Sequence, residues 1–257
     1  MSFTFQNSIL VGIIGFVFYL FPLSLWSQSI IHIENRRLAA VDTGFTGTAE
    51  MSANFIQNIN DIFQTVNAAQ IQYSSNPVSL ISLSTYNLTV FNGNNIVNEG
   101  FQHFRFQYKH RTRLFFEAFS QYQFNEIIKI NSRYLNGLGM RYKAINRDSV
   151  KFFSGTVLMR EIENETTGIQ NKHWRLSQYL SFGFPITPQI FVDIISYYQP
   201  DIVNFKDFRS STEAIFDLRI SRRLSLRLVH SLFYDTKPPE GIRTMFYNFR
   251  NGFSYRF

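Results

Sequence analysis

The residues of this chain best suited to acid–base or metal chemistry are its five histidines, which are scattered through the sequence. They are His32, His103, His110, His173 and His230. None forms a His-x-x-x-His pair and the chain has no cysteine, so the common zinc-ligand spacings are absent. The G-x-S-x-G nucleophile motif and the P-loop are absent too. We therefore expect no metal, no cofactor and no enzymatic activity.

A hydrolase is the alternative that these histidines leave open. Hydrolysis by a side chain needs a Ser–His or Asp–His pair in hydrogen-bond contact. Two places offer one, His230 next to Ser231 and His173 beside the polar segment 163–172. Such a phospholipase- or protease-like site would lie on the wall or rim of the fold predicted below.

Charge and composition narrow the class of protein. The formal net charge is +7, but Lys and Arg never occur in runs longer than two, so we expect no nucleic-acid partner. Aromatic residues make up 17% of the chain, with 29 Phe and 13 Tyr. This much aromatic surface beside abundant polar residues favours a wall between lipid and a polar interior over a soluble core.

The first 29 residues carry no charged side chain, and an apolar run extends from Ile9 to Trp26. Ser27 and Ser29 follow with the spacing of the small residues at a cleavage site, which predicts a secretory signal peptide over 1–29. The run is long enough to span a bilayer, so an uncleaved anchor is the alternative. We expect a periplasmic lead-in over 30–41 and one barrel domain over 42–257.

From about residue 41 onward the sequence alternates with period two. In "RLFFEAFSQYQF", Phe116, Ala118 and Tyr122 share one face, while Glu117 and Gln121 share the other. Breakers divide the region into about twelve strands. They lie near 42–57, 61–74, 77–91, 99–110, 112–125, 132–145, 148–162, 172–185, 187–199, 207–220, 222–235 and 242–257. The faces of 61–74 and 148–162 cannot be assigned from the pattern.

The connections between these segments alternate in length. Tight ones such as "SSNP" and "PITP" alternate with longer ones such as "NGNNIVN", "ENETTGIQNK" and "DTKPPEG". Outer-membrane barrels have short periplasmic turns and longer outer loops. A sheet can span hydrocarbon only when it closes on itself, because every backbone polar group must be paired. The predicted fold is therefore all-β, a single up-and-down antiparallel transmembrane barrel whose last strand pairs with its first.

The polar face of this barrel carries charged residues that we predict to line a pore. They are Arg105, Lys109, Glu117, Arg133, Arg141, Arg175, Glu213, Asp217, Arg219, Arg227, Arg250 and Arg256. Two interpretations stay open, an ion-pair network that fills a narrow barrel and a small water-filled pore whose excess positive charge favours anions.

The C-terminal segment "NFRNGFSYRF" places aromatic residues on one face and Arg or small polar residues on the other. A terminal aromatic in phase with this alternation resembles the insertion signal read by the outer-membrane assembly machinery. We assign the signal to Phe253, Tyr255 and Phe257.

Three stretches carry a family resemblance. They are "TRLFFEAFSQYQFN", "LNGLGMRYKA" and the final segment "RLSLRLVHSLFYDTKPPEGIRTMFYNFRNGFSYRF". They resemble the YdiY-like salt-induced outer-membrane proteins, a domain-of-unknown-function family, over roughly residues 42–257. The chain departs from the family at the start, where "NFIQNINDIFQ" replaces the usual acidic, glycine-rich hairpin. The resemblance implies a small outer-membrane barrel, no known chemistry, and a role in salt or osmotic envelope stress.

Taken together, these features predict a monomeric, non-enzymatic barrel in the outer membrane of a Gram-negative cell. Its expected partners are outer-membrane lipid and the barrel assembly machinery. A soluble lipid-carrying barrel would reverse the two faces, with the aromatic rows inside and the arginines in water.

Overall fold

The computed structural model of the protein describes residues 43–255, apart from 58, 147–149 and 222. The predicted signal peptide over 1–29, the lead-in over 30–41, and both Arg256 and Phe257 lie outside the described residues. Within the part that is described, no helix is long and apolar enough to cross a bilayer.

The described chain forms twelve strands, as the sequence predicts. They are β1 Thr43–Gln57, β2 Asp61–Ser75, β3 Val78–Phe91, β4 Asn94–Lys109, β5 Leu114–Asn125, β6 Ile130–Asn146, β7 Lys151–Glu165, β8 Gln170–Thr187, β9 Ile190–Pro200, β10 Phe208–Arg219, β11 Leu224–Asp235 and β12 Met245–Tyr255. Each pairs antiparallel with its neighbours in the sequence, so a single up-and-down sheet runs from β1 to β12. The predicted fold class is confirmed.

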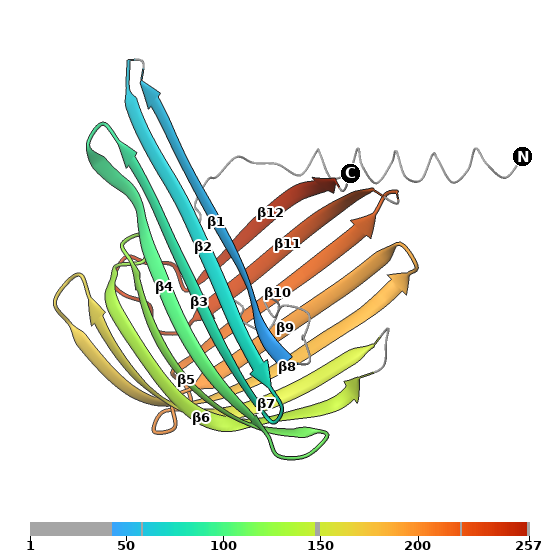
Figure 1. The fold of residues 1–257 in the computed structure, drawn as a ribbon. Helices are drawn as coiled ribbons and strands as arrows, with labels where there is room; N and C mark the ends of the chain where they lie inside the picture. Colours follow the sequence, from blue (N-terminus) through green and yellow to red (C-terminus); the bar gives the residue numbers. More distant parts are fainter. Residues whose placement is uncertain (1–42, 58, 147–149, 222, 256–257) are drawn as a thin grey trace, which may run out of the picture.

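The sheet curves strongly, with β5–β12 forming a trough and the β1–β2 hairpin projecting away from β12 (Figure 1). We predicted that the last strand pairs with the first. Among the described strands, β12 pairs only with β11 and β1 only with β2, so this structure does not contain the predicted pair. The outer edges of β1 and β12 therefore keep backbone groups that no described strand pairs.

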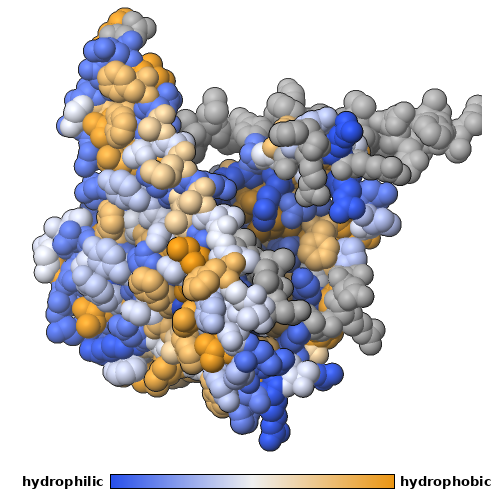
Figure 2. Space-filling model, viewed as in Figure 1, coloured by the Kyte–Doolittle hydropathy of each residue, from blue (hydrophilic) through white to orange (hydrophobic). Residues whose placement is uncertain are grey.

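The two faces of the sheet differ as the alternation predicts. On β4, Glu99, His103 and Arg105 are buried on the concave inward face, while Phe104 and Phe106 are exposed on the outward face. Apolar side chains are exposed at many points of the surface in Figure 2, including along the β1–β2 hairpin. This facing excludes the inverted arrangement of a soluble lipid carrier.

The connections lie at two ends, which we call the loop end and the turn end. Loop-end connections include 126–129, 166–169, 201–207 and 236–244, and turn-end connections include 76–77, 110–113 and 188–189. The prediction that "NGNNIVN" forms a long connection is wrong, because β3 and β4 are joined by a two-residue turn at Asn92 and Gly93. Both residues have positive φ, as a type I′ hairpin turn requires, and this lets the strands extend to the turn.

Exposed aromatic residues form a row near each end of the outward face. The loop-end row contains Tyr86, Tyr122, Tyr134, Trp174, Tyr198 and Tyr234. The turn-end row contains Tyr108, Tyr142, Phe182 and Tyr255. Tyr197, next to Tyr198 on β9, faces inward and lines the interior cavity.

The spacing of these rows suits a thin membrane. Tyr134 and Tyr142 are eight residues apart on β6, as are Trp174 and Phe182 on β8. Eight residues at ~3.3 Å each, tilted by ~40°, rise ~20 Å along the axis of a barrel. This is close to the ~25 Å apolar band of outer-membrane barrels, which aromatic girdles flank.

Candidate functional site: a salt-bridged interior

The inward face at the loop end is filled by a buried ion-pair network centred on Glu161 of β7. Arg175 of β8, which is only 1% exposed, donates from Nε to Glu161 Oε2 at 2.5 Å. Its Nη2 donates to Asp207 Oδ1 at 3.0 Å, and its Nη1 contacts the backbone oxygen of Gln199 at 3.2 Å. Arg175 therefore ties β8 to β7, to β9 and to the loop before β10.

Two further arginines complete the network. Arg209 of β10 donates to Glu161, to Glu163 Oε2 at 3.1 Å and to Asp235 Oδ2 at 2.6 Å. Arg133 of β6 donates from Nε to Glu163 Oε2 at 2.5 Å and lies 3.2 Å from Glu161 Oε1. Glu161 thus contacts three guanidinium groups that come from three different strands. Removing one partner of such a buried set typically costs about 3–5 kcal/mol.

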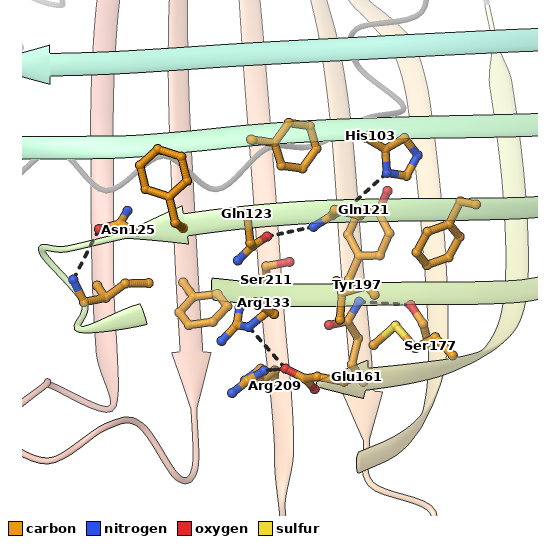
Figure 3. A pocket seen from close by; sticks show the side chains of 18 of the residues that line it. His103, Gln121, Gln123, Asn125, Arg133, Glu161, Ser177, Tyr197, Arg209 and Ser211 are labelled. Carbon is orange, nitrogen blue, oxygen red and sulfur yellow. Dashed lines mark hydrogen bonds and ion pairs between the residues drawn. The ribbon is translucent and has the colours of Figure 1, made fainter. Parts of the chain in front are cut away.

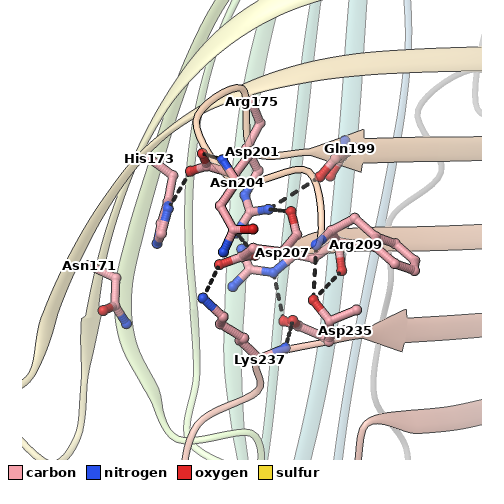
Figure 4. Close-up of polar contacts among 12 residues, drawn as sticks. Asn171, His173, Arg175, Gln199, Asp201, Asn204, Asp207, Arg209, Asp235 and Lys237 are labelled. Atoms are coloured by element: carbon pink, nitrogen blue, oxygen red, sulfur yellow. Dashed lines mark hydrogen bonds and ion pairs between the residues drawn. The ribbon is translucent and has the colours of Figure 1, made fainter.

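The 201–207 loop is held against this network (Figure 4). Asp207 accepts from Arg175 and lies 3.3 Å from Lys237 Nζ of the 236–244 loop. Asp201 binds His173 Nδ1 at 2.6 Å and accepts the backbone N–H groups of Val203 and Asn204. Burial by itself would raise the pKa of Asp201, but the hydrogen bonds from Asn204, His173 and Val203 lower the pKa below its usual value. Both loops are therefore fastened to the interior.

The charges of the network balance, which differs from the cationic lumen that the sequence suggested. Arg133, Arg175, Arg209 and Lys237 face an equal number of carboxylates. Those carboxylates are Glu161, Glu163, Asp207 and Asp235. Sequence reasoning missed Arg209 and all four carboxylates. The "EIENE" alternation at 161–165 could have revealed two of them, since it places Glu161, Glu163 and Glu165 on one face.

A small cavity of about 150 Å³ adjoins the network, whose Arg133, Glu161 and Arg209 form part of its wall (Figure 3). The rest of its polar lining includes His103, Gln121, Ser177, Tyr197 and Gln199, and its apolar lining includes Leu135 and Met159. His103 Nδ1 lies 3.1 Å from Gln121 Oε1, and Gln199 donates to Ser177 Oγ at 3.0 Å. The cavity has room for several water molecules but is well below the ~300–1,000 Å³ of common ligand pockets.

Toward the turn end, the interior is crossed by a second set of polar contacts. Tyr179 of β8 donates its hydroxyl to Glu117 Oε2 of β5 at 3.2 Å, passing over the inner faces of β6 and β7. Arg105 Nη1 lies 3.6 Å from the same oxygen, and Gln107 also donates to Glu117. Gly155 of β7 makes this possible, because a Cβ there would overlap the Tyr179 ring.

The turn end of the inward face is cationic. The Arg141 guanidinium lies 4.0 Å from the Phe153 ring centroid and 5.9 Å from that of Phe115, so cation–π contacts hold it in place. Lys109, Lys143 and Lys151 share this face, by register. This region, which we call the basic vestibule, is where the structure gathers the excess positive charge.

The remaining predicted pore residues lie near the β12 edge and are less enclosed. Glu213 is buried, accepts from Ser231 Oγ at 3.1 Å and lies 3.8 Å from Arg250 Nη2. Arg227 and Asp217 form a 3.6 Å ion pair at half-exposed positions. Arg219 is exposed at the turn end. Their inward register agrees with the sequence phasing, and the unpaired edge of β12 accounts for the exposure of Asp217 and Arg227.

Two of the three residues assigned to the predicted assembly signal are among the described residues. Phe253 and Tyr255 lie on the outward face of β12, and Phe253 is 72% exposed. This facing is the one that an aromatic C-terminal strand needs if it contacts lipid or an assembly partner.

Of the two histidines considered for hydrolysis, His173 contacts an acidic side chain and His230 does not contact its expected serine. His230 points outward beside Tyr247 and Phe249, whereas Ser231 points inward to Glu213, so the two cannot form a catalytic pair. His173 does contact an aspartate, Asp201. Among the described residues, no Ser or Thr hydroxyl is hydrogen-bonded to His173, and no group of three or more His, Asp or Glu side chains could hold a metal.

Residues 83–257 match a protein family described as "Protein of unknown function, DUF481". The chain belongs to this family. The DUF481 match confirms the kind of family that the resemblance indicated. It begins within β3, which leaves β1 and β2 outside it and agrees with the departure from the family pattern near the start.

Two solved structures resemble this DUF481 chain. One is the NanC porin, with 8% sequence identity and a TM-score of 0.47, covering 83% of this chain and 98% of that one. The other is OpdL of Pseudomonas aeruginosa, with 9% identity and a TM-score of 0.37, covering 84% of this chain and 86% of that one. No curated protein matches the chain in sequence.

Proposed function

We propose that this protein is a non-enzymatic outer-membrane β-barrel with a narrow, salt-bridged lumen, open to the periplasm through the basic vestibule. The observation that carries the proposal is the contrast between the faces of one sheet. Arg175 and Glu161 are each only 1% exposed inside, while Leu138, Met140 and Tyr142 are exposed outside. A soluble protein has little reason to bury its arginines and expose its leucines.

Spanning a membrane requires the sheet to close. In hydrocarbon, the free backbone groups on the edges of β1 and β12 would each cost several kcal/mol, which favours pairing these two strands. Most inward positions of both strands are polar or small, with Glu50 on β1 and Arg250 on β12, so closure would continue the lining. We therefore propose a closed barrel in the membrane, assembled as a monomer.

The interior suits a small permeation path or a closed structural barrel more than a wide pore. The loop-end network links side chains across the interior from β6 to β11, and the cavity that adjoins it has room for several water molecules only. Small anions would gather at Lys109, Lys143 and Lys151, and the balanced network would then limit their passage. A role in salt or osmotic stress is part of this proposal and rests on the family resemblance.

Planar-bilayer conductance of the refolded protein tests the pore. We expect small current steps with a reversal potential biased toward anions in a salt gradient. The variant Lys143→Gln with Lys151→Gln should reduce that bias, because it removes charge from the vestibule. The matched control is Lys206→Gln, which alters an exposed lysine of the 201–207 loop. If the wild type inserts and no steps appear, the pore is wrong and a closed structural barrel remains.

The second candidate, a membrane hydrolase, is favoured by one observation, the 2.6 Å contact between His173 and Asp201. Against it, Asp201 also caps the 201–207 loop through two backbone N–H groups, which accounts for its position structurally. Phospholipase and protease assays on the wild type and His173→Gln test this candidate. Activity that is lost in the variant would establish it.

A further inference from the structure

Arg160 of β7 is a cation on the largely apolar outward face. Its neighbours Met159 and Glu161 are buried inside, so Arg160 itself points outward. It lies opposite Trp174 of β8 in register, and its guanidinium sits 5.4 Å from the Trp174 ring centroid. In the part of the chain that is described, Arg160 has this ring as its partner and no carboxylate.

The level of Arg160 is that of the loop-end aromatic row. Trp174 belongs to this row, and so does Tyr134 on the other side of β7. Lys172, also outward, lies two residues nearer the loop end on β8, opposite Ile162. Trp and Tyr mark the depth of lipid headgroups, so two unpaired cations on neighbouring strands lie where lipid phosphates are found.

An apolar groove of about 940 Å³ adjoins Arg160. It crosses the outward faces of β1–β8, and both Arg160 and Trp174 contribute to its lining. Its apolar lining includes Ile71, Leu80, Phe104, Leu138 and Leu158. A groove of this composition, next to a cation at headgroup depth, complements a molecule with a negative head and an apolar tail.

We propose that this site binds an anionic membrane lipid, with its phosphate on Arg160 and Lys172 and an acyl chain in the groove. The inference rests on the proposed membrane location. A guanidinium binds phosphate oxygens through its planar N–H edge, and the cation–π contact with Trp174 holds the Arg160 guanidinium near this position. Lys172 adds a second positive charge, and its flexible ammonium group can approach the phosphate from many directions.

Native mass spectrometry of the refolded protein in detergent, titrated with phosphatidylglycerol or phosphatidylcholine, tests the site. We expect the wild type to retain phosphatidylglycerol ~10-fold better, as two charge-assisted contacts predict. Arg160→Gln with Lys172→Gln should abolish that preference. The matched control, Arg227→Gln, removes an inward-facing arginine near β12 and should leave it unchanged. Excess inorganic phosphate should not displace the lipid, because the acyl chain contributes to binding.

Fluorescence quenching provides a second measurement that needs no destabilising variant. The chain has two tryptophans, so Trp26→Phe leaves Trp174 as the single reporter. Brominated phosphatidylglycerol should quench Trp174 more strongly than brominated phosphatidylcholine at equal mole fraction. Equal quenching, equal retention, or full displacement by inorganic phosphate would overturn the proposal. Failure of the wild type to insert into bilayers would instead count against the proposed function.

Discussion

The hydroxyl of Tyr179 on β8 reaches Glu117 on β5, so one side chain links strands that are three positions apart in the sheet. The ring can lie along the inner wall because glycines occupy inward positions beneath it. Gly155 is directly under the ring, and Gly137 and Gly139 of β6 are too close to neighbouring atoms to carry a Cβ. Small residues on the lumen face therefore allow large ones to cross it, which keeps the interior narrow.

This arrangement predicts that Gly155→Val destabilises the protein more than Tyr179→Phe does. The phenylalanine variant loses one hydrogen bond to a buried carboxylate, which costs about 1–3 kcal/mol. The valine would force the ring off the wall and break the same bond as well. Urea unfolding in detergent, followed by heat-modifiable gel mobility, measures both. Tyr142→Phe, on the outward face, is the control. A fully stable Gly155→Val variant would contradict the predicted ring position.

The loop-end network predicts that Glu161→Gln both destabilises the barrel and increases its conductance. Three guanidinium groups would lose their shared carboxylate, at a cost of about 3–5 kcal/mol. The positive charge left in the lumen should also widen the path and strengthen anion selectivity. Single-channel recording and urea unfolding measure the two effects. Glu126→Gln, in an exposed loop, is the matched control. Unchanged conductance in Glu161→Gln would show that the network does not limit flow.

If β1 and β12 pair in the membrane, engineered disulfides between them should form only between positions on the same face of the sheet. Residues directly opposite in an antiparallel pair share a face, so outward positions link only to outward positions. Ala49→Cys on β1 should therefore oxidise readily with Cys placed at one of the outward positions 249, 251 or 253 of β12. Glu50→Cys, which faces inward, should not link to any of these three. Gel mobility with and without reductant reads the result, and absence of every cross-link in membranes would disprove closure.

Because the Asp201 carboxylate holds the 201–207 loop through hydrogen bonds, we expect acid to loosen that loop. Its folded-state pKa is lower than its ordinary value of 3.8, because the hydrogen bonds from Asn204, His173 and Val203 outweigh burial. The stability that Asp201 contributes is present above the unfolded-state value and is lost as the pH falls through the lower folded-state pKa. Hydrogen exchange of residues 201–207 should therefore become faster, after correction for intrinsic rates, as the pH drops below about 4. Asp201→Asn should show fast exchange at both pH values.

Removing Phe257 should slow assembly in cells without changing stability once the protein is folded. The reason is that the terminal aromatic would act through recognition by the assembly machinery. Pulse-chase of the heat-modifiable form measures the rate. Phe253→Ala should have a similar effect if the outward aromatic row of β12 is read as a unit.

Much of the fold could be predicted because successive side chains of a strand point to opposite faces, so polar and apolar residues alternate along the sequence. The facing of "RLFFEAFSQYQF" and "RYLNGLGMRYKA" is correct, since burial on one side of a strand requires a period of two. Most strand ends lie within a few residues of their predicted places. The connection at Asn92 and Gly93 was misjudged, because a polar stretch looks the same in a loop and in a strand that extends beyond its apolar part.

Ion pairing was much harder to predict. Arg133, Arg175 and Glu117 were named as inward residues, yet their contacts could not be. Each inward row has several polar side chains within reach on neighbouring strands, and the Tyr179–Glu117 contact passes over two strands. Arg209 and Glu161 are 48 residues apart, and no local pattern specifies that they meet. The phase of 148–162 was unreadable, since Met159 and Val157 are apolar and yet face inward among the charges.

The amino-acid sequence by itself determined the number of strands, which side chains share a face, and the separation of an apolar from a charged surface, because these depend on neighbours two residues apart. Only the tertiary structure decided which arginine meets which carboxylate, that the network is neutral and sits at the loop end, and that Arg160 lies on the outward face against Trp174. The physical reason is that curvature and stagger of the sheet set which inward rows approach one another, and both arise from the whole set of strands.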